Sequence, residues 1–205
     1  MPWIDLARDE RHDLATFLET LTPSQWEAPT LCERWNVRDV VAHTISFDEL
    51  RGAALIGRFV KGWLRTDRIN QVGVDDYADH TPEELIALIR KHAEPHGMTA
   101  GFGGRVALTD NMIHQQDIRR PLQLPRTIDA RRLRVALDFA VTAPTIRGAR
   151  RAKRLHLVAT DIDWSHGGGP EVQGPGEALL MAMAGRSDAL SDLSGPGKDT
   201  LTARM

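Results

Sequence analysis

The stretch Asp110-Asn111-Met112-Ile113-His114 carries the residue types best suited to chemistry in this chain. Asp110 and His114 are four residues apart in a segment that predicts a helix, so their side chains lie one above the other on the same face. Ala107 and Ile118 share that face, which indicates that it points toward a core. A polar pair on such a face needs partners, because burying an unpaired polar group is costly. A metal ion is one such partner.

A second imidazole occupies an apolar stripe of an earlier segment with helical spacing. His43 lies on this stripe with Val40 and Phe47. If the stripe faces that of Asp110 and His114, the three side chains form a site with two nitrogen ligands and one oxygen ligand. Three protein ligands with open positions are typical of a catalytic metal rather than a structural one. Zinc is the ion that this ligand set favours, and nickel, iron or manganese would also fit it.

Two simpler interpretations account for the same three residues. Asp and His at positions i and i+4 often form only a hydrogen bond on a helix surface, which contributes roughly a few tenths of a kcal/mol. A single His among apolar residues is more often a hydrogen-bonded core residue than a metal ligand. Spacing alone leaves both interpretations open beside the metal site.

Cap signals predict the helices that would position these residues. The apolar stripe over residues 14–21 predicts a first helix, and Thr22-Pro23-Ser24-Gln25 has the capping chemistry of a short helix that follows it. Asn36, with Asp39 three residues later, can cap a long helix that passes through His43 and ends at about residue 60. The segment from Trp63 to His80 contains a glycine and several Asp without sustained periodicity, and it predicts a crossover loop.

The remaining signals of this half of the chain complete a helical bundle. Thr81-Pro82-Glu83-Glu84 is the strongest cap in the sequence and predicts a helix that stops near Pro95. A fourth long helix is expected from about Gly104, with Asp110 and His114 on it, ending before Pro121. Four helices with one long crossover form a bundle, and the cores of such bundles hold metal sites built from facing helices.

The pattern changes in the C-terminal part of the chain. Residues 121–128 read as a linker, and an apolar stripe over residues 133–141 predicts one further helix. Residues 155–160 alternate like a strand, the turn Gly167-Gly168-Gly169-Pro170 predicts a hairpin to residues 171–173, and a helix is expected over residues 175–184. The sequence therefore predicts a mainly α protein, with a helical bundle over residues 1–125 and a linker helix and small α+β unit over residues 126–205.

Other residues near the Asp/His pair have a functional and a structural interpretation. Asp117 could orient a ligand imidazole, or it could pair with Arg38 or Arg120. Arg119 and Arg120 could bind a carboxylate of a substrate or a thiol cofactor, or they could complement the dipole at a helix C-terminus. Cys32 has no base beside it in the sequence, so packing at a helix entrance is the preferred interpretation over a nucleophile.

Composition restricts the classes of function. The formal net charge of -2 gives no general attraction to nucleic acid or to anionic lipid, and the basic run from Arg147 to Arg154 lacks the interleaved aromatic residues that stack on bases. The sequence has no apolar run near the ~20 residues of a membrane span, and Met1-Pro2-Trp3 does not begin a signal peptide. A single cysteine fits a reducing compartment. We therefore expect a cytoplasmic protein without nucleic-acid or membrane partners.

Three parts of the sequence together resemble a known family. The run from Pro29 to His43, the stretch from Asp110 to Leu122 and the tail from Val158 to Gly167 are similar to the mycothiol-dependent maleylpyruvate isomerase family. That family belongs to the DinB-like superfamily of metal-binding four-helix bundles, and the tail resembles a small C-terminal domain attached to such bundles. The resemblance puts His43, Asp110 and His114 on the metal-ligand positions. Asp110 stands where the isomerase usually has Glu, so the carboxylate is one methylene shorter.

The resemblance also implies an activity and its partners. It predicts a metal-dependent enzyme that uses mycothiol or a similar low-molecular-weight thiol, either as an isomerase or as a thiol S-transferase acting on a small electrophile. In such an enzyme the reactive thiol comes from mycothiol and not from the protein. A homodimer is also compatible with the sequence. The alternative is a non-catalytic metal- or ligand-binding protein that keeps the DinB-like bundle, because a fold does not determine a function.

Overall fold

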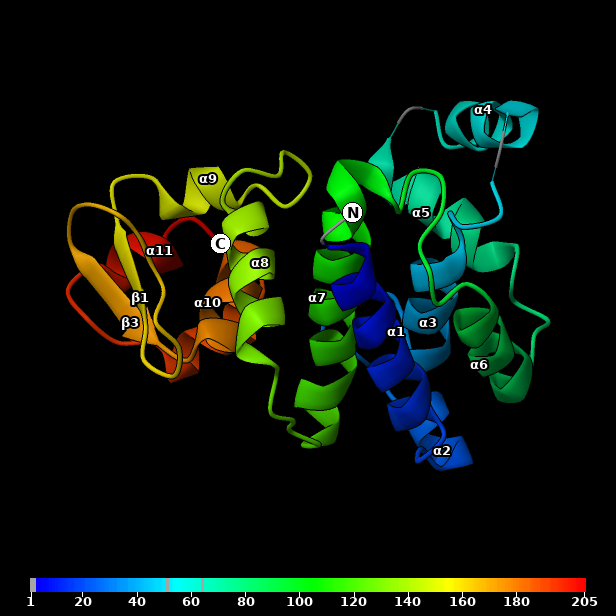
Figure 1. Ribbon diagram of the computed structural model, residues 1–205, viewed down its shortest axis with the longest axis horizontal. Helices are drawn as coiled ribbons and strands as arrows, with labels where there is room; N and C mark the ends of the chain where they lie inside the picture. Colours follow the sequence, from blue (N-terminus) through cyan, green and yellow to red (C-terminus); the bar gives the residue numbers. More distant parts are fainter. Residues whose placement is uncertain (1–2, 51, 64) are drawn as a thin grey trace. The chain divides into compact units, whose positions relative to one another are not determined.

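A computed structural model describes residues 3–50, 52–63 and 65–205. Met1 and Pro2, on which the expectation of no signal peptide partly rests, lie outside the described residues. The chain forms two compact units, Met1–Pro125 and Arg126–Met205. The first unit is helical, and the second contains helices and a small three-stranded sheet (Figure 1). The predicted mainly α fold is confirmed.

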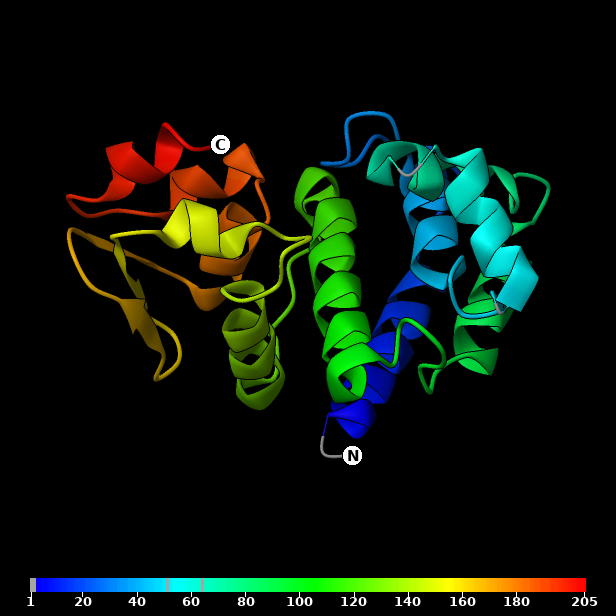
Figure 2. The same cartoon turned by 90° about the horizontal axis from the view of Figure 1, so that it is seen from above.

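Four helices build the bundle of the first unit: α1 (Ile4–Leu18), α3 (Val37–Ile45), α6 (Pro82–Lys91) and α7 (Arg105–Leu122). Helix α1 packs against α6 and α7, and α3 packs against the same two helices, so the four close around one core (Figures 1 and 2). The buried residues of that core are Leu14, Ala15, Phe17, Leu18, Trp26, Val37, Val40, Val41, Ala42, Ile45, Leu85, Ile89 and Ile118.

Capping boxes begin three helices where the sequence predicts them. Thr22 caps the short α2 (Pro23–Trp26), Asn36 caps α3 and Thr81 caps α6; each side chain accepts a hydrogen bond from the backbone N–H three residues later. In each case the side chain of that later residue also accepts from the N–H of the cap residue. Two N–H groups that the helix leaves without a partner are thereby satisfied, which fixes the first turn.

The long helix predicted from Asn36 to about residue 60 is wrong, because α3 ends at Ile45. Both the backbone N–H and the hydroxyl of Ser46 donate to the carbonyl of His43, at 3.1 and 3.0 Å, which closes the last turn. The chain then turns so that the carboxylate of Asp48 meets the buried guanidinium of Arg11, with Nη2 and Oδ2 3.0 Å apart. A tertiary ion pair thus ends a helix that local periodicity would have continued.

The crossover loop predicted from Trp63 to His80 is also wrong, because this segment contains α5 (Thr66–Asp75). It follows α4 (Gly52–Lys61); α5 packs on α3, and α4 packs on α5. Gly73, which suggested a loop, instead allows close packing: a Cβ there would lie 2.7 Å from the Ser46 hydroxyl and 2.8 Å from Nη1 of Arg58. The buried Arg58 donates to the Ser46 carbonyl at 2.7 Å.

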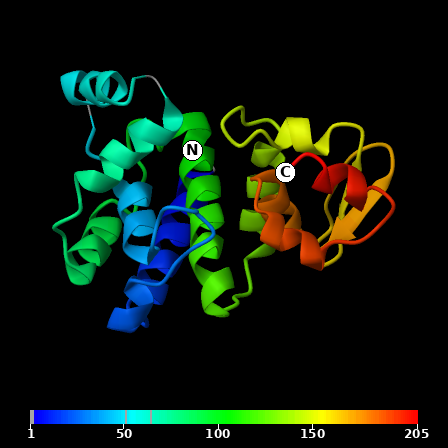
Figure 3. The same cartoon turned by 180° about the vertical axis from the view of Figure 1, so that it is seen from behind.

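Helix α7 continues through Pro121 to Leu122, whereas the sequence predicted an end before the proline. Proline lacks the N–H that would bond to the carbonyl four residues earlier, here that of Asp117. The backbone N–H of Leu31 donates to that carbonyl instead, at 3.0 Å. The loop between α2 and α3 therefore reaches across to the C-terminal half of α7 (Figures 2 and 3).

The second unit packs helices against a mixed sheet. Its helices are α8 (Ala130–Ala140), α9 (Gly148–Ala152), α10 (Gly176–Met183) and α11 (Lys198–Thr202), and its strands are β1 (His156–Ala159), β2 (Ser165–Gly167) and β3 (Glu171–Gly174). Helix α10 packs on α8 and on β1 and β3. The described helices include none with the length and apolar character needed to cross a membrane.

The sheet corrects the hairpin predicted between residues 155–160 and 171–173. The strand order is β2-β1-β3; β1 pairs antiparallel with β2 and parallel with β3. The hairpin closes earlier, where the N–H of Ala159 donates to the carbonyl of Trp164 at 3.0 Å. The glycine-rich turn after Gly167 then carries the chain to the other edge of β1, where Val172 pairs with Leu157.

Candidate metal centre

Helix α7 presents three titratable side chains on one face. Asp110, His114 and Asp117 are spaced by four and three residues, so they lie on consecutive turns. The three differ in their access to solvent, because the side chain of Asp110 is 43 % exposed, that of His114 10 % and that of Asp117 0 %. The helix therefore carries a polar row that runs from the solvent into the core.

Helix α3 adds a second imidazole to this row. His43 is buried, and its ring centroid lies 4.8 Å from that of His114, with the two rings nearly perpendicular. The Nε2 atom of His114 is 3.5 Å from Oδ1 of Asp110. One ligand atom from each of His43, Asp110 and His114 lies within 4.8 Å of the others. The three sequence-predicted ligands are thus brought together, because α3 packs against α7.

Asp117 contacts the other ring nitrogen of His114. Nδ1 of His114 lies 2.9 Å from Oδ2 of Asp117, a hydrogen bond in which the ring nitrogen donates to the buried carboxylate. A carboxylate that holds one ring nitrogen of a His fixes its tautomer and leaves the other nitrogen as a metal ligand. This geometry supports the orienting interpretation of Asp117. Arg38 pairs with Glu27, at 3.1 Å, and a pairing of Asp117 with Arg120 stays the alternative.

Cys32 belongs to the same cluster, which the sequence did not indicate. Its Sγ atom lies 3.2 Å from Oδ2 of Asp117 and 3.9 Å from Nδ1 of His114. Cys32, His114 and Asp117 form a second group with ligand atoms close enough to hold a metal ion. The packing role expected for Cys32 is therefore incomplete. A separation of 82 residues from His114 left no signal in the local sequence.

Two aromatic rings contact the imidazole of His43. The half-buried ring of Trp35 lies 4.9 Å from that of His43, and its indole N–H donates to Oε1 of Gln71 at 3.0 Å. Phe47 meets His43 edge to face at 6.3 Å, and the guanidinium of Arg58 lies 5.1 Å from the Phe47 ring. Phe47 lies on the apolar stripe of His43, whereas Trp35, Gln71 and Arg58 have no local sequence signal that links them to this site.

The electrostatics of the cluster separate the protonation states of its two imidazoles. Burial, and then the positive charge of His114, lower the pKa of His43 to about 4. Burial also opposes protonation of His114, but the charge of Asp110 and the hydrogen bonds that the ring makes with Asp110, Asp117 and Cys32 raise its pKa well above the ordinary value. Burial opposes ionisation of Asp110, yet the attraction of His114 prevails and lowers the pKa of Asp110 to about 2.

These residues fit a divalent metal ion. Two imidazoles and one ionised carboxylate are ordinary ligands of zinc and similar ions. The Nδ1 atom of His43 is buried without a hydrogen-bond partner among the described residues. His43 is also held in the neutral form that a metal requires of a His ligand. The ligand role of His43, Asp110 and His114 remains a prediction that this geometry supports.

Arg119 and Arg120 are the two arginines suggested for substrate binding, and the structure assigns contacts to Arg119. Arg119 donates to the carbonyl of Leu124 at 2.9 Å, and its guanidinium lies 3.7 Å from the ring of Phe17. These contacts give Arg119 a structural role at the end of α7. Arg120 is half-buried in the same turn, and a carboxylate-binding role for it stays a prediction.

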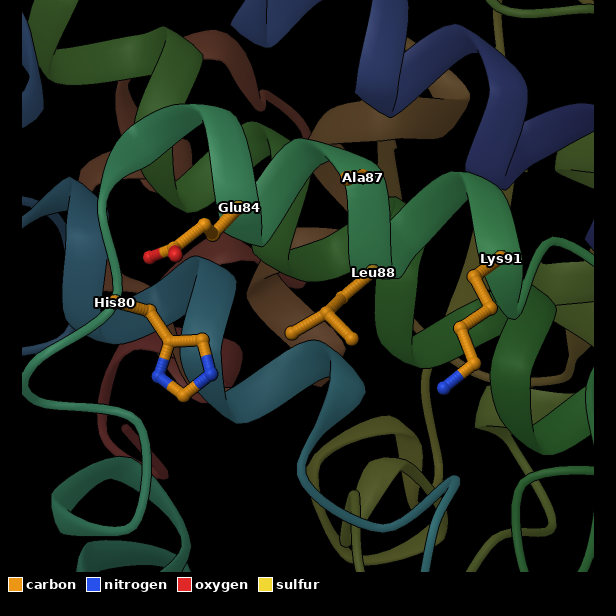
Figure 4. Close-up of a pocket in the computed structure, with 5 residues that line it drawn as sticks. All are labelled: His80, Glu84, Ala87, Leu88 and Lys91. Carbon is orange, nitrogen blue, oxygen red and sulfur yellow. The ribbon is translucent and has the colours of Figure 1, made fainter.

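A separate surface pocket lies on α6. It has a volume of about 290 Å³ and is lined by His80, Glu84, Ala87, Leu88 and Lys91, all shown in Figure 4. Its charged groups already have partners in the fold, because Glu84 accepts from the N–H of Thr81 and Lys91 pairs with Glu49 at 2.7 Å. None of the five lining residues belongs to either metal-ligating group, so the pocket does not mark the chemical site.

Residues 7–96 match the mycothiol maleylpyruvate isomerase N-terminal domain family. The match confirms the predicted family resemblance over the segment that carries His43, and it ends before α7. No curated protein matches the sequence significantly.

One solved structure extends the likeness to the whole chain at the level of the fold. It is the crystal structure of a point mutant of the mycothiol-dependent maleylpyruvate isomerase, with a TM-score of 0.57 and 13 % sequence identity. The alignment covers 95 % of this chain and 92 % of that one. At this identity the likeness establishes a shared fold, with a helical bundle followed by a small unit that contains a sheet.

Proposed function

We propose that this protein is a metal-dependent enzyme that activates a low-molecular-weight thiol, of the mycothiol kind, for reaction with an electrophilic small molecule. The observation that supports this most directly is the approach of His43, Asp110 and His114 to a common point, with Asp117 behind His114. The family match at residues 7–96 supports the thiol part of the proposal, because the name of that family includes the thiol mycothiol.

Each residue has a separate task in this proposal. His43 and His114 supply neutral nitrogen ligands from facing helices, and Asp110 supplies the oxygen ligand and one negative charge. Asp117 accepts from Nδ1 of His114 and thereby keeps Nε2 directed toward Asp110. Mutation of such outer carboxylates typically lowers metal affinity by about 10–100-fold, so Asp117 is a positioning residue in this site.

Access and exclusion of water also fit the proposal. The exposed edge of Asp110 gives the site an opening to solvent, through which a thiol and a substrate can approach. His43 is buried, and the rings of Trp35 and Phe47 contact it, which limits the access of water to this ligand. A divalent ion bound among the three ligands would supply positive charge that favours the thiolate form of a nearby thiol.

The reaction class depends on the fate of the thiol. In an isomerisation the thiol adds to an electrophilic carbon, the former double bond rotates, and the thiol leaves again. In a conjugation the thiol remains attached to the product, and the enzyme is an S-transferase. The alternative proposal is a metal- or ligand-binding protein without catalysis, since a bundle of this kind does not require an activity.

Metal analysis followed by thiol titration separates these proposals. We expect the purified protein to contain about one divalent ion per chain, as a single three-ligand site requires. After exchange for cobalt(II), addition of mycothiol or cysteine should change the visible spectrum. A cobalt-loaded protein whose visible spectrum does not change when a thiol is added would support the non-catalytic alternative.

Two matched substitutions test the ligand assignment. His114→Ala should remove both the bound metal and the thiol-dependent spectral change, because it deletes a ligand atom. His12→Ala should change neither, because His12 is an exposed residue of α1. A metal content in His114→Ala equal to that of the unmodified protein would contradict the assignment.

A further inference from the structure

The two metal-ligating groups of the first unit share His114 but use opposite edges of its ring. Nε2 faces Asp110 at 3.5 Å, and Nδ1 faces Asp117 at 2.9 Å and Cys32 at 3.9 Å. The first group offers only nitrogen and oxygen atoms, whereas the second offers the sulfur of Cys32 as well. Soft cations prefer thiolate ligands over carboxylate and imidazole. The two groups therefore differ in the kind of ion that they would select.

The distances within the second group are close to those of a coordinated ion. In a tetrahedral zinc site, with metal–nitrogen and metal–oxygen bonds of about 2.1 Å and a metal–sulfur bond of about 2.3 Å, ligand atoms lie roughly 3.3–3.8 Å apart. The observed separations are 3.2 Å between sulfur and carboxylate, 3.9 Å between sulfur and imidazole, and 2.9 Å between imidazole and carboxylate. Only small movements of the side chains are needed to admit an ion.

Two backbone contacts hold the sulfur in this place. The N–H of Leu31 donates to the carbonyl of Asp117, and the N–H of Cys32 donates to the hydroxyl of Thr30 at 3.1 Å. The Thr30 hydroxyl in turn donates to the carbonyl of Trp35 at 2.8 Å. Cys32 is half-buried and Asp117 is fully buried, so an ion would enter past the thiol and meet the carboxylate beneath it.

We propose that Cys32, His114 and Asp117 form a second cation site, specific for thiophilic divalent ions such as cadmium. The thiolate and the carboxylate together carry two negative charges, which balance the charge of the ion, and the imidazole of His114 adds a neutral nitrogen through Nδ1. Binding releases the Cys32 and His114 protons to the solvent and leaves the fourth position to water. The site goes beyond the proposed enzyme function and does not depend on it. Because a neutral ring that binds an ion through Nδ1 carries its proton on Nε2, His114 serves only one of the two groups at a time.

Cadmium absorbance provides the test, because bonding of a thiolate to cadmium produces an ultraviolet charge-transfer band. The sequence contains one cysteine, so any such band reports Cys32 alone. Titration of the full-length, metal-free protein should give a band that saturates at about one cadmium per chain. Absence of the band at saturating cadmium would overturn the proposal.

Two substitutions locate the ion. Asp117→Asn should raise the dissociation constant of cadmium by at least about tenfold, the minimum cost of losing a ligating or orienting carboxylate. Asp79→Asn, at an exposed carboxylate, is the matched control and should leave the constant unchanged. A folded Asp117→Asn protein with unaltered cadmium affinity would show that the sulfur binds alone and would overturn the site.

His43→Ala separates the two groups and the two proposals. It removes a ligand of the first group only, so the cadmium band should persist while the cobalt spectrum loses its response to thiols. Loss of the band in His43→Ala would mean that cadmium binding at Cys32 requires a ligand of the first group, and it would overturn a separate second site. If Asp117→Asn does not fold, X-ray absorption of the cadmium-loaded protein decides. One sulfur together with an imidazole ring supports the site, and a shell that lacks either of them refutes it.

Discussion

At the scale of single residues, His114 is the centre of the chemistry because each of its ring nitrogens has a different carboxylate neighbour. Asp117 holds Nδ1 and Asp110 faces Nε2. His43 stands opposite with a neutral ring. One imidazole is therefore stabilised in its charged form in the metal-free protein while the other is kept uncharged. This difference predicts how metal binding depends on pH.

Metal binding at neutral pH should release about one proton from His114, because a metal ligand must be deprotonated. The raised pKa of His114 means that this ring is charged before the ion binds, whereas His43, with a pKa of about 4, is already neutral. Zinc affinity should thus rise with pH until the pKa of His114 is passed, and fall in acid. Calorimetric zinc titrations in two buffers with different ionisation enthalpies measure the released proton. Heats that do not depend on the buffer would contradict a protonated His114.

At the scale of secondary-structure elements, tertiary polar contacts decide where several helices end. The buried pair of Arg11 and Asp48 ties α1 to the turn after α3, and the hydroxyl of Thr99 also donates to Asp48, at 2.6 Å. Arg58 ties α4 to the same turn through the carbonyl of Ser46. These contacts hold α3, which carries His43, at a defined height against α7.

Arg11→Met should lower the free energy of unfolding by about 3–5 kcal/mol, because it leaves the buried charge of Asp48 without its partner. The double variant Arg11→Met/Asp48→Leu should recover much of this loss, since no unpaired charge remains. Urea unfolding followed by circular dichroism measures both. Arg65→Met, which breaks the exposed pair with Asp67, is the control and should cost at most about 1 kcal/mol. Equal losses in the single and the double variant would refute the ion-pair explanation.

The caps make a smaller contribution that can be measured separately. Thr81→Ala removes the side chain that accepts from the N–H of Glu84 at the start of α6, and we expect a loss of about 1 kcal/mol in the free energy of unfolding. Thr66→Ala, at an exposed position in the first turn of α5, should change it by a few tenths at most, roughly the difference in helix propensity. The same urea experiment compares the two.

At the scale of the whole molecule, every residue assigned to either metal group belongs to the unit Met1–Pro125. The second unit has its own apolar interior, in which α10 covers β1 and β3 and contributes fully buried side chains such as Leu179 and Met181. Metal binding and the fold of the sheet therefore have separate structural bases. The C-terminal unit contributes no residue to either metal group, so any role of this unit in the proposed reaction would concern the substrate.

A fragment of residues 1–125 should bind zinc with the same dissociation constant as the full chain, within about threefold, because the ligands and Asp117 are all retained. Competition with a chromogenic chelator measures both constants. The same fragment carrying His114→Ala is the control and should not compete. A folded fragment that binds zinc much more weakly would mean that residues 126–205 contribute to the site.

The features that could be predicted from the sequence are those with a local cause. Thr22, Asn36 and Thr81 each satisfy N–H groups within four residues, so the start of α2, α3 and α6 follows from short-range chemistry. The pairing of Asp110 with His114 follows from helical spacing in the same way. Helical spacing alone does not identify His43 as the third ligand. The apolar stripe around His43 and the family resemblance were needed to predict it.

Tertiary packing decided the rest, because the deciding contacts join residues far apart in the chain. Helix α3 ends at Ile45 since Asp48 pairs with Arg11, 37 residues away. Gly73 lies inside a helix because only a residue without a side chain lets α5 pack closely against Arg58. Cys32 reaches His114 because Pro121 leaves the carbonyl of Asp117 to the N–H of Leu31. Local periodicity carries no information on such contacts, and the free energy that they contribute exceeds the small preferences of single residues for helix or loop.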